Sequence, residues 1–336
     1  MPDLKIYQSG RAGRITFARP KALNALSHQM ALDLFGALND WREDPRIDLI
    51  IITAEGEKAF CAGGDIADLY RAGVAGNHQV GRDFFRDEYR LNAAISDYPK
   101  PIVAFMQGFV MGGGVGVGGH ASHRIVGDTT KISMPESTIG LIPDVGGTWL
   151  LGRAPGRIGE YLALTAGRIG PGDAVHAGFA DHYLPEAEWP ALIADLERSG
   201  DAARIRGQTP PHAPLSERDL SAFGERNVAE IIAALEIAGD EETLRPLRHN
   251  SPLSMAAGLV MIRASRGDRR LQESLSREYR FTWRATECSD FLEGVRAQII
   301  DKDRNPQWSA DASEANVLRL LASLDEQELR WTEETA

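Results

Sequence analysis

Cysteine is scarce in this chain, and no residues have the spacing of a structural zinc site. The two cysteines, Cys61 and Cys288, are too few for a disulfide framework. The eight histidines form no pair of metal-binding type on a convincing helix face, so no resident metal ion is predicted. The first residues carry neither the apolar core of a signal peptide nor an Arg- and Ser-rich amphipathic stretch. Together these features predict a reducing, cytoplasmic location.

Basic residues are outnumbered by acidic ones. The 336 residues include 37 Lys and Arg against 48 Asp and Glu, which gives a formal net charge of -11. Nucleic-acid binding depends on basic side chains that neutralise phosphates, so the composition argues against nucleic acid as a partner. No membrane-spanning segment is predicted either. The uncharged run 101–119 contains seven glycines and Gln107, whereas a spanning helix needs about 20 predominantly large apolar residues.

The apolar content of 43% is enough to fill a sizeable core, and its pattern alternates between strand and helix. Apolar runs at 48–53 and 102–106 each lead into a glycine turn and then a helical pattern. Such alternation predicts an α/β fold with a mainly parallel sheet, in which ligands bind at the carboxyl ends of the strands. Both glycine turns follow such ends, so we expect them to face one shared site.

Beyond residue 200 the pattern changes. Residues 200–214 are rich in Pro and small polar residues, and the chain then becomes helical. Residues 1–200 are therefore predicted to form the core that carries the site, and residues 215–330 a helical region that packs over it. Ser27, Asn227 and Ser251 precede apolar helical faces and are predicted to be N-cap residues.

Two carboxylates, Glu136 and Asp144, lie among Pro, Gly and aliphatic residues in the stretch MPESTIGLIPDVGGT. Carboxyl groups in apolar surroundings have raised proton affinity, which suits acid–base or nucleophilic catalysis. Other roles remain open at this stage. Glu136 would then be a solvated loop acid, and Asp144 a helix cap or the partner of an arginine.

Two further patterns suggest other chemistry. Residues 114–119 satisfy GxGxxG after a strand, which is the pattern of a dinucleotide-binding turn. That fold needs an acidic residue at the end of a second strand, but the acid at about the right distance, Glu136, lies inside MPES. Cys61, beside the first glycine turn, suggests a thiol nucleophile; free cysteines in such places are more often small buried apolar residues.

The motifs RPKALNAL, FCAGGDI and MGGG resemble those of the crotonase (enoyl-CoA hydratase/isomerase) superfamily. The resemblance implies a crotonase-type α/β fold that binds an acyl-CoA. It also implies that the backbone N–H groups of Gly64 and Gly113 hold the thioester carbonyl oxygen. CoA would then be part of the substrate, and no separate cofactor is expected. A homo-oligomer remains open.

Within that superfamily, the motif MPExxIGLxPDVGG resembles the 3-hydroxyisobutyryl-CoA hydrolase subfamily, as do FFRDEYRLN and DFLEGVRAQIIDKDRNPQW. Hydratases of the superfamily use two glutamates; the first position is Gly116 here and the second is Glu136. The resemblance implies a thioesterase of valine catabolism that acts on a short 3-hydroxyacyl-CoA. Glu136 and Asp144 would be catalytic and Glu88 would contact substrate. The alternatives are an enoyl-CoA hydratase or isomerase and a non-catalytic acyl-CoA-binding protein.

Overall fold

The computed structural model describes residues 2–331, which divide into two compact units. Each unit is assembled from three separate stretches of chain. The first contains the residues up to Asp65, Leu91–Ser133 and Arg168–Arg218, and the second contains Ile66–Arg90, Met134–Gly167 and the residues from Asp219 onward. This interleaving differs from the two consecutive ranges, 1–200 and 215–330, expected from the sequence. The packing of residues 215–330 over the remainder stays a prediction.

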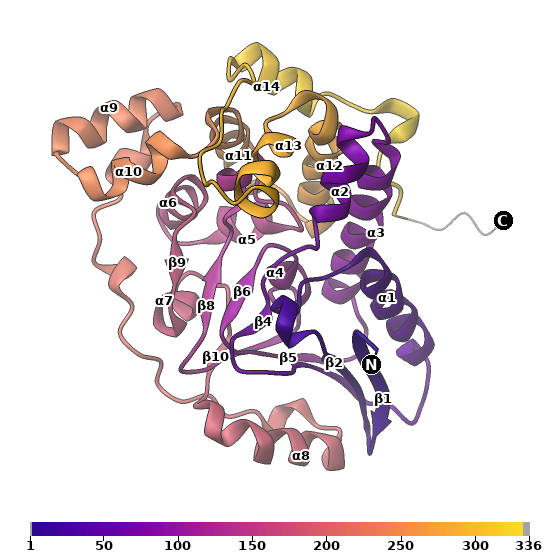
Figure 1. The fold of residues 1–336 in the computed structure, drawn as a ribbon. Helices are drawn as coiled ribbons and strands as arrows, with labels where there is room; N and C mark the ends of the chain where they lie inside the picture. The colour runs from indigo at the N-terminus through magenta and orange to yellow at the C-terminus, as the bar shows by residue number, and fades with distance from the viewer. Residues whose placement is uncertain (1, 332–336) are drawn as a thin grey trace. The chain divides into compact units, whose positions relative to one another are not determined.

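Two sheets form the first unit (Figure 1). The six-stranded sheet has the order β1 (Leu4–Ser9), β2 (Ala12–Phe17), β3 (Leu49–Ala54), β5 (Ile102–Met106), β7 (His123–Val126) and β10 (His182–Tyr183). The four-stranded sheet has the order β4 (Ala59–Cys61), β6 (Phe109–Met111), β8 (Lys131–Ser133) and β9 (Arg168–Ile169). All neighbouring strands are parallel except the pairs β1–β2 and β8–β9. The prediction of a mainly parallel α/β fold is therefore confirmed.

Short helices complete the first unit. They are η1 (Pro20–Ala22), α1 (His28–Arg42), α4 (Gly113–Gly118), α7 (Pro171–His176), η3 (Glu186–Glu188), α8 (Trp189–Ser199), η4 (Ala202–Arg204) and η5 (Pro214–Ser216). Alternate residues of the central strands, such as Val103 and Phe105 of β5, pack with Trp189 and Leu196 of α8 in one apolar cluster. The Trp189 ring meets Phe105 edge-on, and its Nε1 donates to the Leu184 carbonyl oxygen at 2.9 Å, so the polar end of the indole is satisfied.

Helices form the second unit. They are α2 (Ala67–Val74), α3 (Gln79–Ser96), which continues into the first unit, η2 (Glu136–Ile139), α5 (Gly147–Arg153), α6 (Ile158–Thr165), η6 (Ser221–Gly224), α9 (Val228–Ala238), α10 (Glu241–His249), α11 (Pro252–Ser265), α12 (Leu271–Cys288), α13 (Phe291–Val295), the π-helical turn η7 (Arg296–Ile300), α14 (Glu314–Leu321) and η8 (Asp325–Gln327). The predicted N-cap residues are confirmed: the side chains of Ser27, Asn227 and Ser251 each accept from a backbone N–H in the first turn.

Helix α11 packs against α5 and α6, and Gly152 allows the approach to α5. A Cβ atom at this glycine would lie 2.9 Å from the Ile262 carbonyl oxygen of α11. Because the obstacle is backbone, a larger residue at position 152 would push the helices apart.

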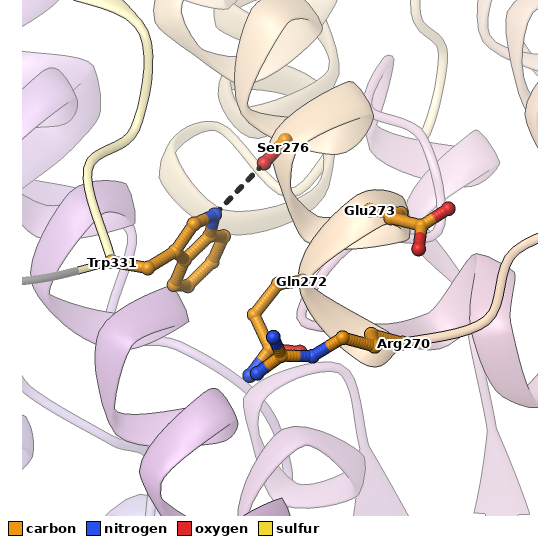
Figure 2. A pocket seen from close by; sticks show the side chains of 5 residues that line it. All are labelled: Arg270, Gln272, Glu273, Ser276 and Trp331. Atoms are coloured by element: carbon orange, nitrogen blue, oxygen red, sulfur yellow. Dashed lines mark hydrogen bonds between the residues drawn. The ribbon is translucent and has the colours of Figure 1, made fainter.

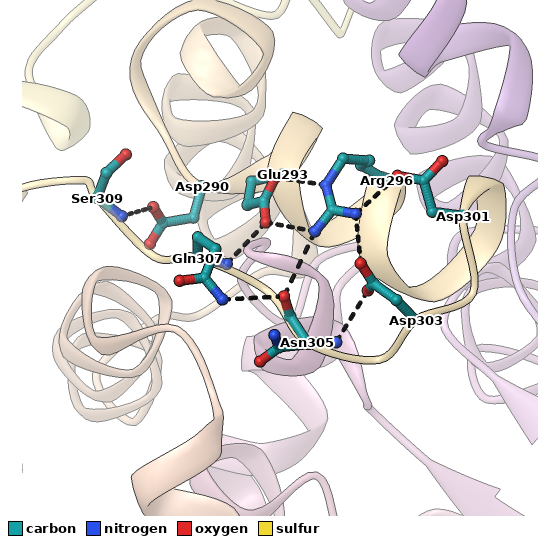
Figure 3. Close-up of polar contacts among 8 residues, drawn as sticks. All are labelled: Asp290, Glu293, Arg296, Asp301, Asp303, Asn305, Gln307 and Ser309. Atoms are coloured by element: carbon teal, nitrogen blue, oxygen red, sulfur yellow. Dashed lines mark hydrogen bonds and ion pairs between the residues drawn. The ribbon is translucent and has the colours of Figure 1, made fainter.

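Residues 290–309 form a polar network (Figure 3). The Arg296 guanidinium binds Glu293 through two nitrogens, each at 2.8 Å, and also pairs with Asp301 and Asp303 at 2.7 Å. These hydrogen bonds raise the pKa of Arg296. Asp290 is buried and accepts from the Ser251 hydroxyl at 2.7 Å and from the backbone N–H of Ala310 at 3.0 Å. The charges of Glu293, Arg296, Asp301 and Asp303 are therefore paired within the segment, and the N-cap of α11 helps to hold Asp290.

Helix α13 lies directly against η2, backbone to backbone. A Cβ atom at Gly294 would overlap the Ile139 main chain, and one at Gly140 would overlap the main chain of Asp290. Gly140 also has a φ of +71°, a conformation that side chains disfavour. Two glycines thus allow a distant segment of chain to support the turn that begins with Glu136.

No helix within residues 2–331 is long and apolar enough to cross a membrane.

We expect Gly294→Ala to lower the free energy of unfolding by about 1–3 kcal/mol, the usual cost of overpacking against backbone that cannot move aside. Gly36→Ala is the matched control, because Gly36 lies in helix α1 and an added Cβ meets nothing within 4 Å. The control should be neutral or stabilising by up to about 1 kcal/mol. Urea denaturation followed by circular dichroism measures both. Equal stability of the two variants would contradict the contact between α13 and η2.

Candidate active site

The two predicted glycine turns follow neighbouring strands of the four-stranded sheet. Strands β4 and β6 are parallel and hydrogen-bonded to each other; Gly64 comes three residues after β4, and Gly113 comes two residues after β6. The turns are in close contact. A Cβ atom at Gly114 would overlap the Cys61 carbonyl oxygen, and one at Gly63 would lie 3.6 Å from the Met111 carbonyl oxygen. The first unit therefore brings the two turns side by side, as the sequence predicts.

Gly64 is held by a single parallel bridge to Leu26. The Leu26 amide donates to the Gly63 carbonyl oxygen at 2.9 Å, and the Asp65 amide donates to the Leu26 carbonyl oxygen at 2.8 Å. In such a bridge the central residue directs its own N–H and C=O away from the partner strand. The Gly64 N–H group therefore points away from Leu26, with its direction fixed by the two neighbouring bonds.

Gly113 is the first residue of α4, so its N–H group has no acceptor within the helix. Gly112 before it has a φ of +46°, which turns the chain sharply from β6 into the helix. Its carbonyl oxygen accepts from the Val115 and Gly116 amides at 2.8 and 3.0 Å, and these bonds fix the first turn of α4. Both turns thus present oriented backbone N–H groups, which is the requirement for stabilising an oxyanion.

The glycines of α4 serve close packing. A Cβ atom at Gly118 would lie 2.6 Å from the Met106 sulfur, and Gly114 contacts the Cys61 main chain. The GxGxxG pattern thus lies in the short helix α4 and its C-cap Gly119, and Glu136 lies in η2 rather than at a strand end. Neither feature fits a dinucleotide-binding turn. Cys61 is buried, with its sulfur 3.6 Å from the Gly63 carbonyl oxygen, as for a small core residue rather than an exposed nucleophile.

The predicted carboxylates lie in the second unit, where the buried acidic side chains include Glu88, Glu136, Asp144 and Glu278. Their exposed fractions are 2% for Glu88 on α3, 4% for Glu136 at the start of η2, 4% for Asp144 before α5, and 0% for Glu278 on α12. The first three were named from the sequence as candidate site residues, Glu88 only through the family resemblance. The pKa values of all four carboxyl groups are linked, because a negative charge on Asp144 raises the pKa of Glu88, Glu136 and Glu278.

Glu136 is buried with one carboxyl oxygen, Oε2, that has no hydrogen-bond partner within residues 2–331. Burial, and then the charge of Asp144, raise its pKa well above the ordinary value. Burial and Asp144 raise the pKa of Glu88 in the same way, and its Oε1 also lacks a partner in the described chain. Buried carboxyl oxygens without partners are costly in free energy, and at a catalytic site they are available to substrate or water.

Asp144 has a defined partner. The buried Tyr89 hydroxyl donates to its Oδ2 at 2.8 Å and lies 3.3 Å from the Thr282 hydroxyl oxygen. Burial raises the pKa of Asp144 to about 7, and the hydrogen bond from Tyr89 acts in the opposite direction. Asp144 therefore changes its charge near neutral pH. No arginine pairing of the kind considered from sequence is found for Asp144 within residues 2–331.

Glu278 was missed by the sequence analysis. Its carboxylate accepts from the backbone amides of Gly146 at 2.8 Å and Thr148 at 3.0 Å and from the Thr148 hydroxyl. Burial raises its pKa to about 8, while these three hydrogen bonds act to lower it. A signal was present in the sequence: position 278 shares the apolar face of α12 with Leu271, Leu275 and Thr282, where an acidic residue is out of place.

Within residues 2–331, no group of three or more His, Cys, Asp or Glu side chains is arranged to hold a metal ion. The pocket in Figure 2 is lined by Arg270, Gln272, Glu273, Ser276 and Trp331. None of the four buried acids described above lines it. Its volume of about 210 Å³ is below the roughly 300–1,000 Å³ of typical ligand sites. The pocket is therefore too small for a CoA thioester.

Proteins similar to this chain over most of its length are named for three different activities on CoA compounds. The family model for enoyl-CoA hydratase/isomerase matches residues 12–319. A Xenopus tropicalis protein named 3-hydroxyisobutyryl-CoA hydrolase, mitochondrial, is 39% identical over 92% of this chain and 85% of its own length. A solved Rhodobacter sphaeroides structure, described as an enoyl-CoA hydratase, is 51% identical with a TM-score of 0.94, and the match covers 98% of this chain and all of that one. A Mycobacterium thermoresistibile structure, described as a carnitinyl-CoA dehydratase, is 38% identical with a TM-score of 0.93 over 99% of this chain and all of that one.

These relatives overturn the predicted cytoplasmic location, which is therefore wrong. The Xenopus tropicalis relative and those from Gallus gallus, Danio rerio and Rattus norvegicus are named as mitochondrial proteins. The prediction depended on low cysteine content and on the composition of the first residues. Cysteine content reports only redox conditions, which do not distinguish one reducing compartment from another.

The raised pKa of Asp144 predicts how stability depends on pH. Its ordinary pKa is 3.8 and its pKa in the folded protein is about 7, so between these values the folded protein binds more protons than the unfolded chain. The free energy of unfolding should therefore fall as pH rises through this window, by roughly 2–4 kcal/mol from this group. Asp144→Asn keeps an acceptor for Tyr89 and removes the charge. Its unfolding free energy, measured in urea from pH 4 to 8, should decline less and exceed the wild-type value at pH 8. Parallel pH curves would show that Asp144 ionises normally.

Proposed function

This chain belongs to the enoyl-CoA hydratase/isomerase family, and we propose that it is a thioesterase that hydrolyses 3-hydroxyisobutyryl-CoA to the free acid and CoA. The relatives named for this activity are aligned over most of the chain. The observation that carries the proposal is the buried pair Glu136 and Asp144, combined with glycine at position 116, where hydratases of the family have their first acid. The first acid of the hydratase pair is thus absent, and Asp144 accompanies Glu136 instead.

We further propose that the N–H groups of Gly64 and Gly113 donate hydrogen bonds to the thioester carbonyl oxygen. Hydrolysis converts that oxygen into an anion when a nucleophile adds to the carbonyl carbon, so donors aimed at it lower the barrier. Each well-placed donor stabilises such a transition state by about 3–4 kcal/mol, a magnitude known from acyl transfer in another enzyme.

Glu136 is proposed as the nucleophile or general base. As a base it removes a proton from water while the water oxygen bonds to the carbonyl carbon; as a nucleophile it forms an anhydride that water then opens. In either case the C–S bond breaks and the CoA thiolate leaves with the electron pair. The free oxygen of Glu136 and its raised pKa suit either role.

Asp144 has two proposed roles. Its negative charge raises the proton affinity of Glu136, since two nearby carboxylates resist ionising together. Asp144 or Glu88 also accepts a hydrogen bond from the 3-hydroxyl group of the substrate. The free Oε1 of Glu88 suits that contact.

Enoyl-CoA hydration or isomerisation is the second candidate, favoured by the description of the similar Rhodobacter sphaeroides structure. A non-catalytic acyl-CoA-binding protein is a third. The deciding experiment incubates the protein with a panel of acyl-CoA esters and measures thiol release and enoyl hydration in parallel. Rapid thiol release from 3-hydroxyisobutyryl-CoA supports the proposal; hydration without thiol release supports the second candidate, and binding alone the third.

Glu136→Gln should lower kcat by about 10²–10⁴-fold with KM changed only a few-fold, because the amide keeps the size of the side chain but cannot act as a base. Steady-state thiol release from 3-hydroxyisobutyryl-CoA measures both constants. Folding is checked by the thermal midpoint, which should be unchanged or raised, since a buried acid is removed. A variant with near wild-type kcat would refute the role of Glu136.

Gly113→Val should lower kcat/KM by about 10²–10³-fold, the usual cost of losing one oxyanion donor, because a β-branched side chain at the start of α4 obstructs approach to its N–H group. Gly36→Val is the control for introducing valine at a helical glycine in the same unit, and it should retain activity. Circular dichroism shows whether each variant is folded. Retained turnover in a folded Gly113→Val protein would place the oxyanion donors elsewhere.

A further inference from the structure

Glu278 is a buried carboxylate without a cationic partner. No ion pair with Lys or Arg is found for it within residues 2–331, and its three hydrogen bonds come from Gly146 and Thr148. Glu160 of α6 is equally buried but is surrounded by Arg157, Arg263 and Arg266. Burying an uncompensated carboxylate costs free energy, which distinguishes Glu278 from an ordinary structural acid.

The residues that Glu278 binds lie directly after Asp144. The backbone adopts the left-handed conformation at two residues there, with a φ of +53° at Val145 and +77° at Gly146. A β-branched residue rarely adopts such a φ, so Val145 is held in a strained conformation. The turn is closed by the Gly147 amide, which donates to the Asp144 carbonyl oxygen at 2.6 Å. The two oxygens of Glu278 bind the backbone on both sides of Gly147.

The same face of α12 also reaches Asp144 by another route. Thr282, one helical turn after Glu278, lies 3.3 Å from the Tyr89 hydroxyl, which in turn donates to Asp144. Helix α12 therefore supports Asp144 in two ways. Glu278 holds the main chain that follows Asp144, and Thr282 contacts the tyrosine that binds the Asp144 side chain.

We propose that Glu278 is a positioning residue that holds the strained Val145–Gly146 turn and so fixes where the Asp144 carboxylate lies. The inference rests on the proposed function, in which Asp144 acts on the reaction. Strain at a turn persists only where surrounding contacts impose it. The hydrogen bonds from the Gly146 and Thr148 amides to Glu278 are such contacts, because they hold the backbone directly after the strained Val145. Without them, Val145 relaxes toward negative φ and the Asp144 main chain moves.

Glu278→Gln tests this proposal. Glutamine has the same shape but only one acceptor oxygen, so in either orientation its NH₂ group faces an amide donor, Gly146 or Thr148. We expect kcat for thiol release from 3-hydroxyisobutyryl-CoA to fall by about 10- to 100-fold, the effect of small displacements at an active site, with KM within about 2-fold. Glu160→Gln is the matched control, because it removes an equally buried acid of the same unit; its kcat should stay near wild type even if its thermal midpoint falls.

A second variant separates positioning from general destabilisation. Glycine adopts positive φ without strain, so in Val145→Gly the turn no longer needs Glu278 to hold it in place. In the double variant Val145→Gly/Glu278→Gln, kcat should therefore be several-fold higher than in Glu278→Gln alone. Additive losses, or a kcat for Glu278→Gln equal to that of Glu160→Gln, would overturn the proposal.

The outcomes also distinguish this inference from the proposed function. A wild-type protein that releases no thiol from any acyl-CoA refutes the function itself. An active wild type whose kcat falls on Asp144→Asn but not on Glu278→Gln leaves the function standing and refutes only the positioning role.

Discussion

The chemistry proposed for the second unit depends on the burial of Asp144 and Glu278, for which no ion pair with Lys or Arg is found within residues 2–331. Charged groups removed from water are stabilised only by partners, and here the partners of Asp144 and Glu278 are neutral donors: a tyrosine hydroxyl, a threonine hydroxyl and two backbone amides. Neutral donors stabilise the ionised form less than a guanidinium would, so the protons remain tightly bound. The pKa of Asp144 is therefore about 7 and that of Glu278 about 8, well above the ordinary values of carboxyl groups.

The first unit meets a different requirement. A backbone N–H group that serves as an oxyanion donor needs a fixed direction and an unobstructed approach. Hydrogen bonds on both sides of Gly64 fix its direction, and the start of α4 leaves the Gly113 amide without an intrahelical acceptor. Glycine is needed at position 114 because the Cys61 main chain is too close for a side chain, and at positions 63 and 112 because the backbone φ is positive.

Much of this architecture could be predicted from the sequence, since local patterns determine it. The parallel strands, the paired glycine turns, the three N-caps and the burial of Glu136 and Asp144 follow from apolar runs, capping residues and motifs. The interleaved units and the binding partners of Glu278 could not be predicted in this way. Glu278 binds main chain 130 residues earlier, at Thr148, and neither periodicity nor composition reports which distant turn a buried acid will meet. The roles of Gly64, Gly113, Glu88, Glu136 and Asp144 in catalysis remain predictions.

The contact between α13 and η2 has a consequence for evolution of substrate preference. Glycines 140 and 294 each lie against main chain, Asp290 and Ile139 respectively, rather than against side chains. A clash with a side chain can be relieved by a second substitution that shortens that side chain, but main-chain atoms are present whatever residue is chosen. No compensating substitution is therefore accessible at the contacting positions. Selection for a different acyl group can alter the side chains around the carboxylates, while replacing either glycine keeps its cost in stability whatever residue lies opposite.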